Sequence, residues 1–96
     1  MTINQLVQEQ RELIRSIAAK HGAKNVRIFG SVVRGEADSN SDLDLLVDLG
    51  NQLSPWFPVR LIRELEATLN CKVDVVTEKG LKDRIREQVL AEAKPL

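Results

Sequence analysis

The sequence has no excess of charge of either sign. Its 14 lysine and arginine residues balance 14 aspartate and glutamate residues, so the formal net charge is zero. A protein whose main role is to bind long nucleic acids or an anionic membrane usually presents a clustered basic face. The charge balance therefore argues against direct binding of long nucleic acids and against a membrane surface as the main partner.

The sequence also gives no sign of a disulfide, a membrane span or a signal peptide. Cys71 is the only cysteine, which excludes a disulfide within the chain. No apolar run approaches the roughly 20 residues that a membrane-spanning helix requires, and the first residues do not resemble a signal peptide. From these absences we expect a cytoplasmic protein without a membrane partner.

The sequence contains no internal repeat, low-complexity tract or linker. Its 96 residues are predicted to form one domain that spans residues 1–96. A chain of this length can bury about two thirds of the surface that it exposes when unfolded, which is enough for independent folding.

Hydrophobic spacing predicts helices and strands in alternation. A capping box begins at Thr2. It is followed by an apolar stripe at helical spacing, which predicts a helix that extends to residue 20. Strands are predicted at residues 23–29, 43–47 and 72–77, and further helices at residues 32–35, 55–69 and 81–90. Pro58 allows the helix at residues 55–69 to begin one turn later. The predicted fold is α+β, with a small mixed sheet of three or more strands flanked by helices in the order α-β-α-β-α-β-α.

The most informative segment joins the first two predicted strands. Gly30 and Ser31 form a turn after the first strand, and a polar loop leads from there to Asp42 and Asp44 at the start of the second. Side chains two residues apart on a strand share a face, so the two carboxylates project together. Carboxylates hold Mg²⁺ together with substrate phosphates, and a Gly-Ser turn offers N–H groups and a hydroxyl to those phosphates. This combination indicates phosphoryl or nucleotidyl transfer.

Asp74 strengthens this interpretation. It interrupts an otherwise apolar strand, where burying a carboxylate is costly unless it is paired or bound to a metal. If this strand neighbours the one that carries Asp42 and Asp44, three carboxylates converge and could hold two metal ions.

Other polar and aromatic residues allow more than one interpretation. Arg34 could contact a triphosphate or a partner, or it could be a solvated arginine. His21 is better explained as a charge partner at a helix end than as a catalytic base. Trp56 and Phe57 could stack on a base, anchor a partner or pack in the core.

The spacing of Gly30-Ser31, ten further residues, Asp42-x-Asp44 and a later strand with Asp74 resembles that of the DNA polymerase β-like nucleotidyltransferases. In length and in the form Gly-Ser-x-x-Arg-Gly the chain is similar to their minimal members, the MNT proteins, many of which are antitoxins encoded beside a HEPN-domain toxin. The resemblance implies that Asp42 and Asp44 bind Mg²⁺ and ATP. It further implies that Asp74 completes a second metal site and helps to activate the incoming hydroxyl, while Gly30 and Ser31 hold the β- and γ-phosphates.

By this resemblance, the chain would transfer AMP from ATP to a hydroxyl, with tyrosine expected, of a cognate HEPN-domain toxin and so neutralise it. Larger relatives carry extra domains that hold the acceptor, whereas this chain ends one predicted helix after Asp74. We therefore expect a macromolecular acceptor with its own docking surface. Two alternatives remain open: an antitoxin that masks its toxin without catalysis, and a nucleotidyltransferase that acts on RNA or a small molecule with a separate substrate-binding subunit.

Overall fold

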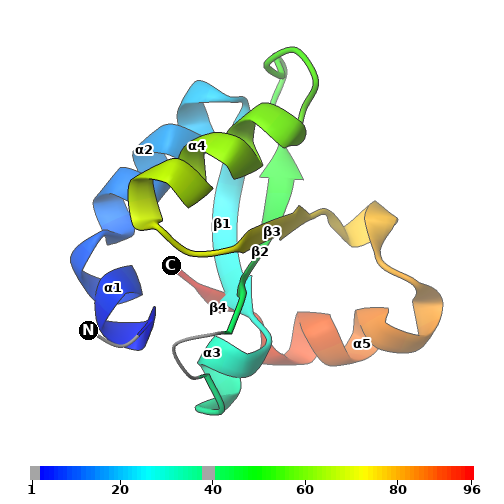
Figure 1. The fold of residues 1–96 in the computed structure, drawn as a ribbon. Coiled ribbons are helices and arrows are strands. Elements are labelled where there is room, and N and C mark those ends of the chain that lie inside the picture. The colour runs from blue at the N-terminus through cyan, green and yellow to red at the C-terminus, as the bar shows by residue number, and fades with distance from the viewer. Residues whose placement is uncertain (1–2, 38–40) are drawn as a thin grey trace.

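The computed structural model describes residues 3–37 and 41–96, so Thr2 of the predicted capping box lies outside the described residues. The chain folds into a mixed α+β domain (Figure 1). Its elements in chain order are α1 (Ile3–Glu9), α2 (Arg11–Lys20), β1 (Ala23–Phe29), α3 (Ser31–Arg34), β2 (Leu43–Leu49), α4 (Val59–Leu69), β3 (Val73–Val76), the 3-10 helix η1 (Glu78–Gly80), α5 (Asp83–Glu92) and β4 (Lys94–Pro95).

The four strands form one sheet in the order β3-β2-β1-β4. β1 pairs antiparallel with both β2 and β4, whereas β2 pairs parallel with β3. The parallel pair is joined by α4, as parallel neighbours require a crossover connection. The predicted mixed sheet with flanking helices is therefore confirmed.

The two faces of the sheet are covered to different extents. Leu43, Leu45 and Val47 of β2 point into the main core, which α2 and α4 cover from one side. Side chains alternate along a strand, so Leu46 points to the opposite face of the sheet. There it packs in a smaller cluster with Leu81, which precedes α5, and Val89, which lies within α5. Asp44 and Asp74 also lie on this second face, outside the main core.

The N-terminal helix is bent where the sequence predicted one continuous helix. Gln10 separates α1 from α2. Helical hydrogen bonds nevertheless continue through this residue, from Gln10 N–H to the Leu6 carbonyl (2.9 Å) and from Ile14 N–H to the Gln10 carbonyl (2.9 Å). The difference is a bend in one helical segment rather than a missing element.

α3, β2, β3 and α5 differ from their predicted ranges by only one or two residues at an end, whereas the differences at α4 and β4 are larger. α4 begins at Val59, one turn after Pro55, because Trp56 has a φ of 61°, a left-handed conformation that cannot continue a right-handed helix. The strand β4 was not predicted. It contains only two residues, and it exists because Lys94 and Pro95 pair with Ile28 and Arg27 of β1.

No helix among residues 3–37 and 41–96 has both the length and the apolar composition needed to cross a membrane.

Candidate active site

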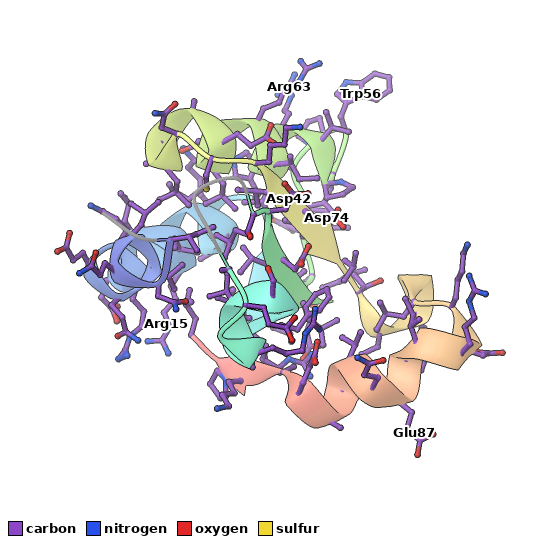
Figure 2. All side chains as sticks on the ribbon, turned by 60° about the horizontal axis from the view of Figure 1, so that its bottom comes forward. Arg15, Asp42, Trp56, Arg63, Asp74 and Glu87 are labelled. Carbon is purple, nitrogen blue, oxygen red and sulfur yellow. The ribbon has the colours of Figure 1, made fainter. Side chains whose placement is uncertain are left out.

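Asp44 and Asp74 are directly paired across the parallel strands β2 and β3. Paired residues on neighbouring strands project to the same face of the sheet, so the adjacency that the sequence left conditional is present. Asp42 directly precedes β2, and Figure 2 shows its side chain beside that of Asp74. The structure thus brings the three predicted carboxylates together at one place on the sheet.

Asp44 experiences the negative charge of the two other carboxylates. The pKa of Asp44 is raised from 3.8 to about 6, first because burial disfavours its charged form and then because Asp74 and Asp42 add negative charge nearby. Arg34 acts in the opposite direction and favours the ionised form. A bound cation would relieve this repulsion.

The three carboxylates differ in their exposure to solvent. Asp42 and Asp74 are exposed, whereas Asp44 is half-buried between them and the Gly30 turn. An incoming substrate can therefore reach the cluster from solvent, while Asp44 forms its more enclosed part.

Gly30 brings the backbone of the turn against Asp44. Phe29 pairs with Asp44 across β1 and β2, which places the next residue beside this carboxylate. Gly30 has a φ of 81°, and a Cβ built on it would lie 2.3 Å from Asp44 Oδ2. Only glycine satisfies both constraints. The short helix predicted at residues 32–35 is present as α3, which begins one residue earlier, at Ser31.

Glu92 is the member of the site that sequence reasoning missed. Its Oε1 accepts hydrogen bonds from the Gly30 N–H (3.0 Å) and from Arg34 Nη1 (3.1 Å). Only 16% of its side chain is exposed. One signal could have revealed it, because a glutamate in the last turn of a helix is disfavoured by the helix dipole. Glu92 is the last residue of α5.

Arg34 lies beside the cluster and is ion-paired. Its Nε donates to Glu36 (3.1 Å) and its Nη1 to Glu92. The hydrogen bonds that the guanidinium donates to Glu36 and then to Glu92 raise its pKa. The Arg34 side chain is 40% exposed, so a ligand can reach its guanidinium from solvent.

The residues present fit Mg²⁺ in their chemistry. Carboxylate oxygens are hard ligands, and Mg²⁺ is usually held by one or two carboxylates together with phosphate oxygens and water. Within residues 3–37 and 41–96, no group of three or more His, Cys, Asp or Glu side chains is already arranged to hold an ion. Part of the coordination shell would then come from substrate phosphates and water.

His21 has a structural role, as the sequence indicated. Its Nδ1 lies 2.8 Å from Ser54 Oγ and its Nε2 lies 2.9 Å from Glu64 Oε1. The ring is buried at the end of α2. Both nitrogens are therefore engaged in joining α2 to α4 and its preceding loop.

The two neighbouring aromatic residues have separate environments. Phe57 packs against the main core, whereas Trp56 is 77% exposed (Figure 2). The core interpretation is thus correct for Phe57 and wrong for Trp56.

A cavity of about 290 Å³ lies elsewhere on the sheet. It is lined by Val47, Asp48, Leu49, Thr77, Glu78 and Lys79, near the ends of β2 and β3. Asp44 lies near the start of β2, and none of the predicted site residues lines this cavity. We place the candidate site at the carboxylates because the charged groups and the Gly30 turn converge there.

Comparison with known families and proteins identifies the family of the chain. A family model described as "Nucleotidyltransferase domain" matches residues 10–96. Protein adenylyltransferase MntA of Thermococcus cleftensis is 38% identical over 78 residues, which cover 81% of this chain and 79% of that protein. A Methanocaldococcus jannaschii protein, provisionally assigned as protein adenylyltransferase MJ0435, is 40% identical over 91% of this chain and 94% of its own length.

Solved structures are also similar to this chain. One, provisionally assigned as a minimal nucleotidyltransferase, has a TM-score of 0.84 and 48% identity, and the match covers 100% of this chain and 97% of that chain. Another, described as a toxin-antitoxin with AMP-PNP, has a TM-score of 0.72 at 23% identity and covers 90% of this chain and 70% of that chain. The second match shows a shared fold.

Proposed function

This chain belongs to the nucleotidyltransferase domain family, and from that premise we propose that it is an Mg²⁺-dependent adenylyltransferase antitoxin. Its reaction would transfer AMP from ATP to a hydroxyl group of a cognate HEPN-domain toxin and so neutralise the toxin. A tyrosine hydroxyl is the expected acceptor, as the resemblance to MNT proteins implies.

One observation supports this proposal more than any other. Asp44 pairs with Asp74 across the strands, and its carboxylate also lies against the backbone of Gly30. Nucleotidyl transfer requires carboxylates that would hold a cation next to groups that would hold the triphosphate.

The carboxylates would hold the metal. Asp42, Asp44 and Asp74 are the candidate ligands, since Asp44 pairs with Asp74 across the strands and the charges of Asp42 and Asp74 both act on Asp44. Bound Mg²⁺ would neutralise phosphate charge and stabilise the charge that develops on the leaving group.

The turn would hold the triphosphate. The Gly30 N–H and the Ser31 hydroxyl would bind the β- and γ-phosphates, with help from the Arg34 guanidinium, which shares the acceptor Glu92 with the Gly30 N–H. With these phosphates held, the α-phosphorus would face the carboxylates.

Transfer then follows as an in-line displacement. The acceptor oxygen forms a bond to the α-phosphorus while the bond from that phosphorus to the bridging α,β-oxygen breaks, and pyrophosphate leaves. Asp74, which is exposed, would accept the proton of the acceptor hydroxyl. Positioning of the reactants supplies much of the rate enhancement in such reactions.

The protein acceptor is supported by relatives rather than by a pocket. Two relatives are named as protein adenylyltransferases, and one structural neighbour is described as a toxin-antitoxin. The exposed position of Asp42 and Asp74 fits an acceptor that approaches from solvent on its own protein surface.

Intact mass spectrometry of the co-encoded neighbour protein tests the proposal. The neighbour is incubated with Mg²⁺, ATP and a small fraction of an equivalent of this chain. We expect nearly all of the neighbour to gain one or more AMP units, because an enzyme turns over. A stable stoichiometric complex with unchanged masses would instead show a masking antitoxin.

A further inference from the structure

Glu92 occupies the groups that the triphosphate needs. The Gly30 N–H and Arg34 Nη1 both donate to its carboxylate, at 3.0 and 3.1 Å, and Nη1 also lies 3.3 Å from its second oxygen. A carboxylate and a phosphate use the same kind of donor, a charged guanidinium and a backbone N–H. Glu92 therefore holds the turn in the way that a phosphate would.

This position is electrostatically unfavourable for a glutamate. Glu92 ends the ten-residue helix α5, where the helix dipole disfavours negative charge. Its charge also acts on Asp44, whose pKa it helps to raise. The side chain is nevertheless mostly buried. The hydrogen bonds from Gly30 and Arg34 must offset these costs, so the contact depends on those two donors.

We propose that Glu92 is a built-in competitor of the nucleotide triphosphate, and that its carboxylate leaves Gly30 and Arg34 when the β- and γ-phosphates bind. This inference rests on the proposed function, because it concerns the same site. The competition lowers the affinity of the site for ATP. It weakens the binding of the pyrophosphate product as well, and so favours product release.

The competition distinguishes ligands by their phosphates. ATP needs the donors that Glu92 holds, because its β- and γ-phosphates bind at the turn. AMP lacks these two phosphates, so its binding does not require Glu92 to leave. Removal of the Glu92 charge is therefore expected to strengthen ATP binding selectively.

Isothermal titration calorimetry in Mg²⁺ buffer, with ATP and with AMP, tests the inference. Glu92→Gln keeps the size of the side chain and loses its charge, and Glu92→Ala removes the carboxylate altogether. For both variants we expect the Kd for ATP to fall roughly tenfold, as is typical when a charged competitor is lost. The Kd for AMP should change less than about twofold. Glu87→Gln is the matched control, because Glu87 lies on the same helix and points into solvent (Figure 2).

Each other outcome has a distinct meaning. Weaker or unchanged ATP binding in Glu92→Gln would overturn the inference and leave the proposed function standing, because Glu92 would then position Arg34 for the phosphates or play no part. Equal strengthening of ATP and AMP binding would also overturn it, since a general charge effect would suffice. Absence of ATP binding in the wild-type protein would contradict the proposed function and, with it, this inference.

Discussion

Asp44 on β2 and Asp74 on β3 are paired neighbours in the parallel part of the sheet, and their carboxylates share the face opposite the main core. Two neighbouring carboxyl groups resist simultaneous ionisation, because their charges have the same sign. This repulsion reduces the stability of the metal-free chain, and the negative charge that causes it attracts a cation. Measurements of stability without metal and of stabilisation by Mg²⁺ distinguish these two effects.

The first prediction concerns the stability of the metal-free protein. Because the pKa of Asp44 is raised to about 6, the folded chain holds this proton more tightly than the unfolded chain does. The stability that this proton confers is present below the ordinary value of 3.8 and is lost as pH rises through about 6. At pH 7, Asp44→Asn should therefore be more stable than the wild type by about 1 kcal/mol, after allowance for solvent screening of a half-buried group.

Urea denaturation of both proteins between pH 3 and pH 7.5, in chelator, measures this effect. The difference in the free energy of unfolding should be near zero at the acidic end and should grow through pH 6. Subtracting the two curves removes the contributions of all other titrating groups. A wild type that is more stable than the variant at pH 7 would contradict the account of the cluster.

The second prediction concerns metal binding. Mg²⁺ should stabilise the wild type, because it binds the folded cluster and relieves the repulsion at Asp44. At ten times its Kd the gain should be about 1 kcal/mol. Asp44→Asn should show little gain. Thermal unfolding with and without MgCl₂ measures this, with NaCl at matched ionic strength as the control. Equal stabilisation of both proteins by Mg²⁺ would place the ion elsewhere.

The third prediction concerns the Gly30 turn. In Gly30→Ala the new Cβ would meet Asp44 Oδ2, and the φ of 81° adds backbone strain. We expect a loss of about 1–3 kcal/mol of stability and a loss of ATP binding. Gly35→Ala is a matched control, because Gly35 has a φ of 75° but nothing within 4 Å of its added Cβ. It should lose about 1 kcal/mol from strain alone and keep ATP binding.

Urea denaturation and ATP titration of the two alanine variants check this contrast. The idea of a close approach between turn and carboxylate fails if both variants lose ATP binding equally, or if Gly30→Ala binds ATP as the wild type does.

Much of the carboxylate site could be predicted from the sequence. The alternation of apolar and polar residues in β2 and β3 places Asp44 and Asp74 on the face away from the core, because the side-chain period of a strand is two. The parallel pairing of these strands was only a condition at that stage. It depends on how α4 crosses between them, which local spacing does not determine.

Glu92 and the conformation of Trp56 could not be predicted in the same way. Glu92 reaches Gly30 across 62 positions of sequence, and this contact depends on how α5 packs on Leu46. The left-handed φ of Trp56 follows from the path of the loop before α4 rather than from any preference of tryptophan. Both features depend on tertiary packing, which a single sequence does not display.

The rate of AMP transfer to the co-encoded partner, compared between Asp44→Asn and Asp48→Asn, tests the central claim most directly. Both substitutions remove one carboxylate charge from β2, but Asp48 pairs with Arg27 and Asn25 rather than with the cluster. Loss of a metal ligand should reduce the rate by about a hundredfold or more in Asp44→Asn, whereas Asp48→Asn should retain a rate near that of the wild type. Equal rates in the two variants would contradict the assignment of the active site to Asp44 and its neighbours.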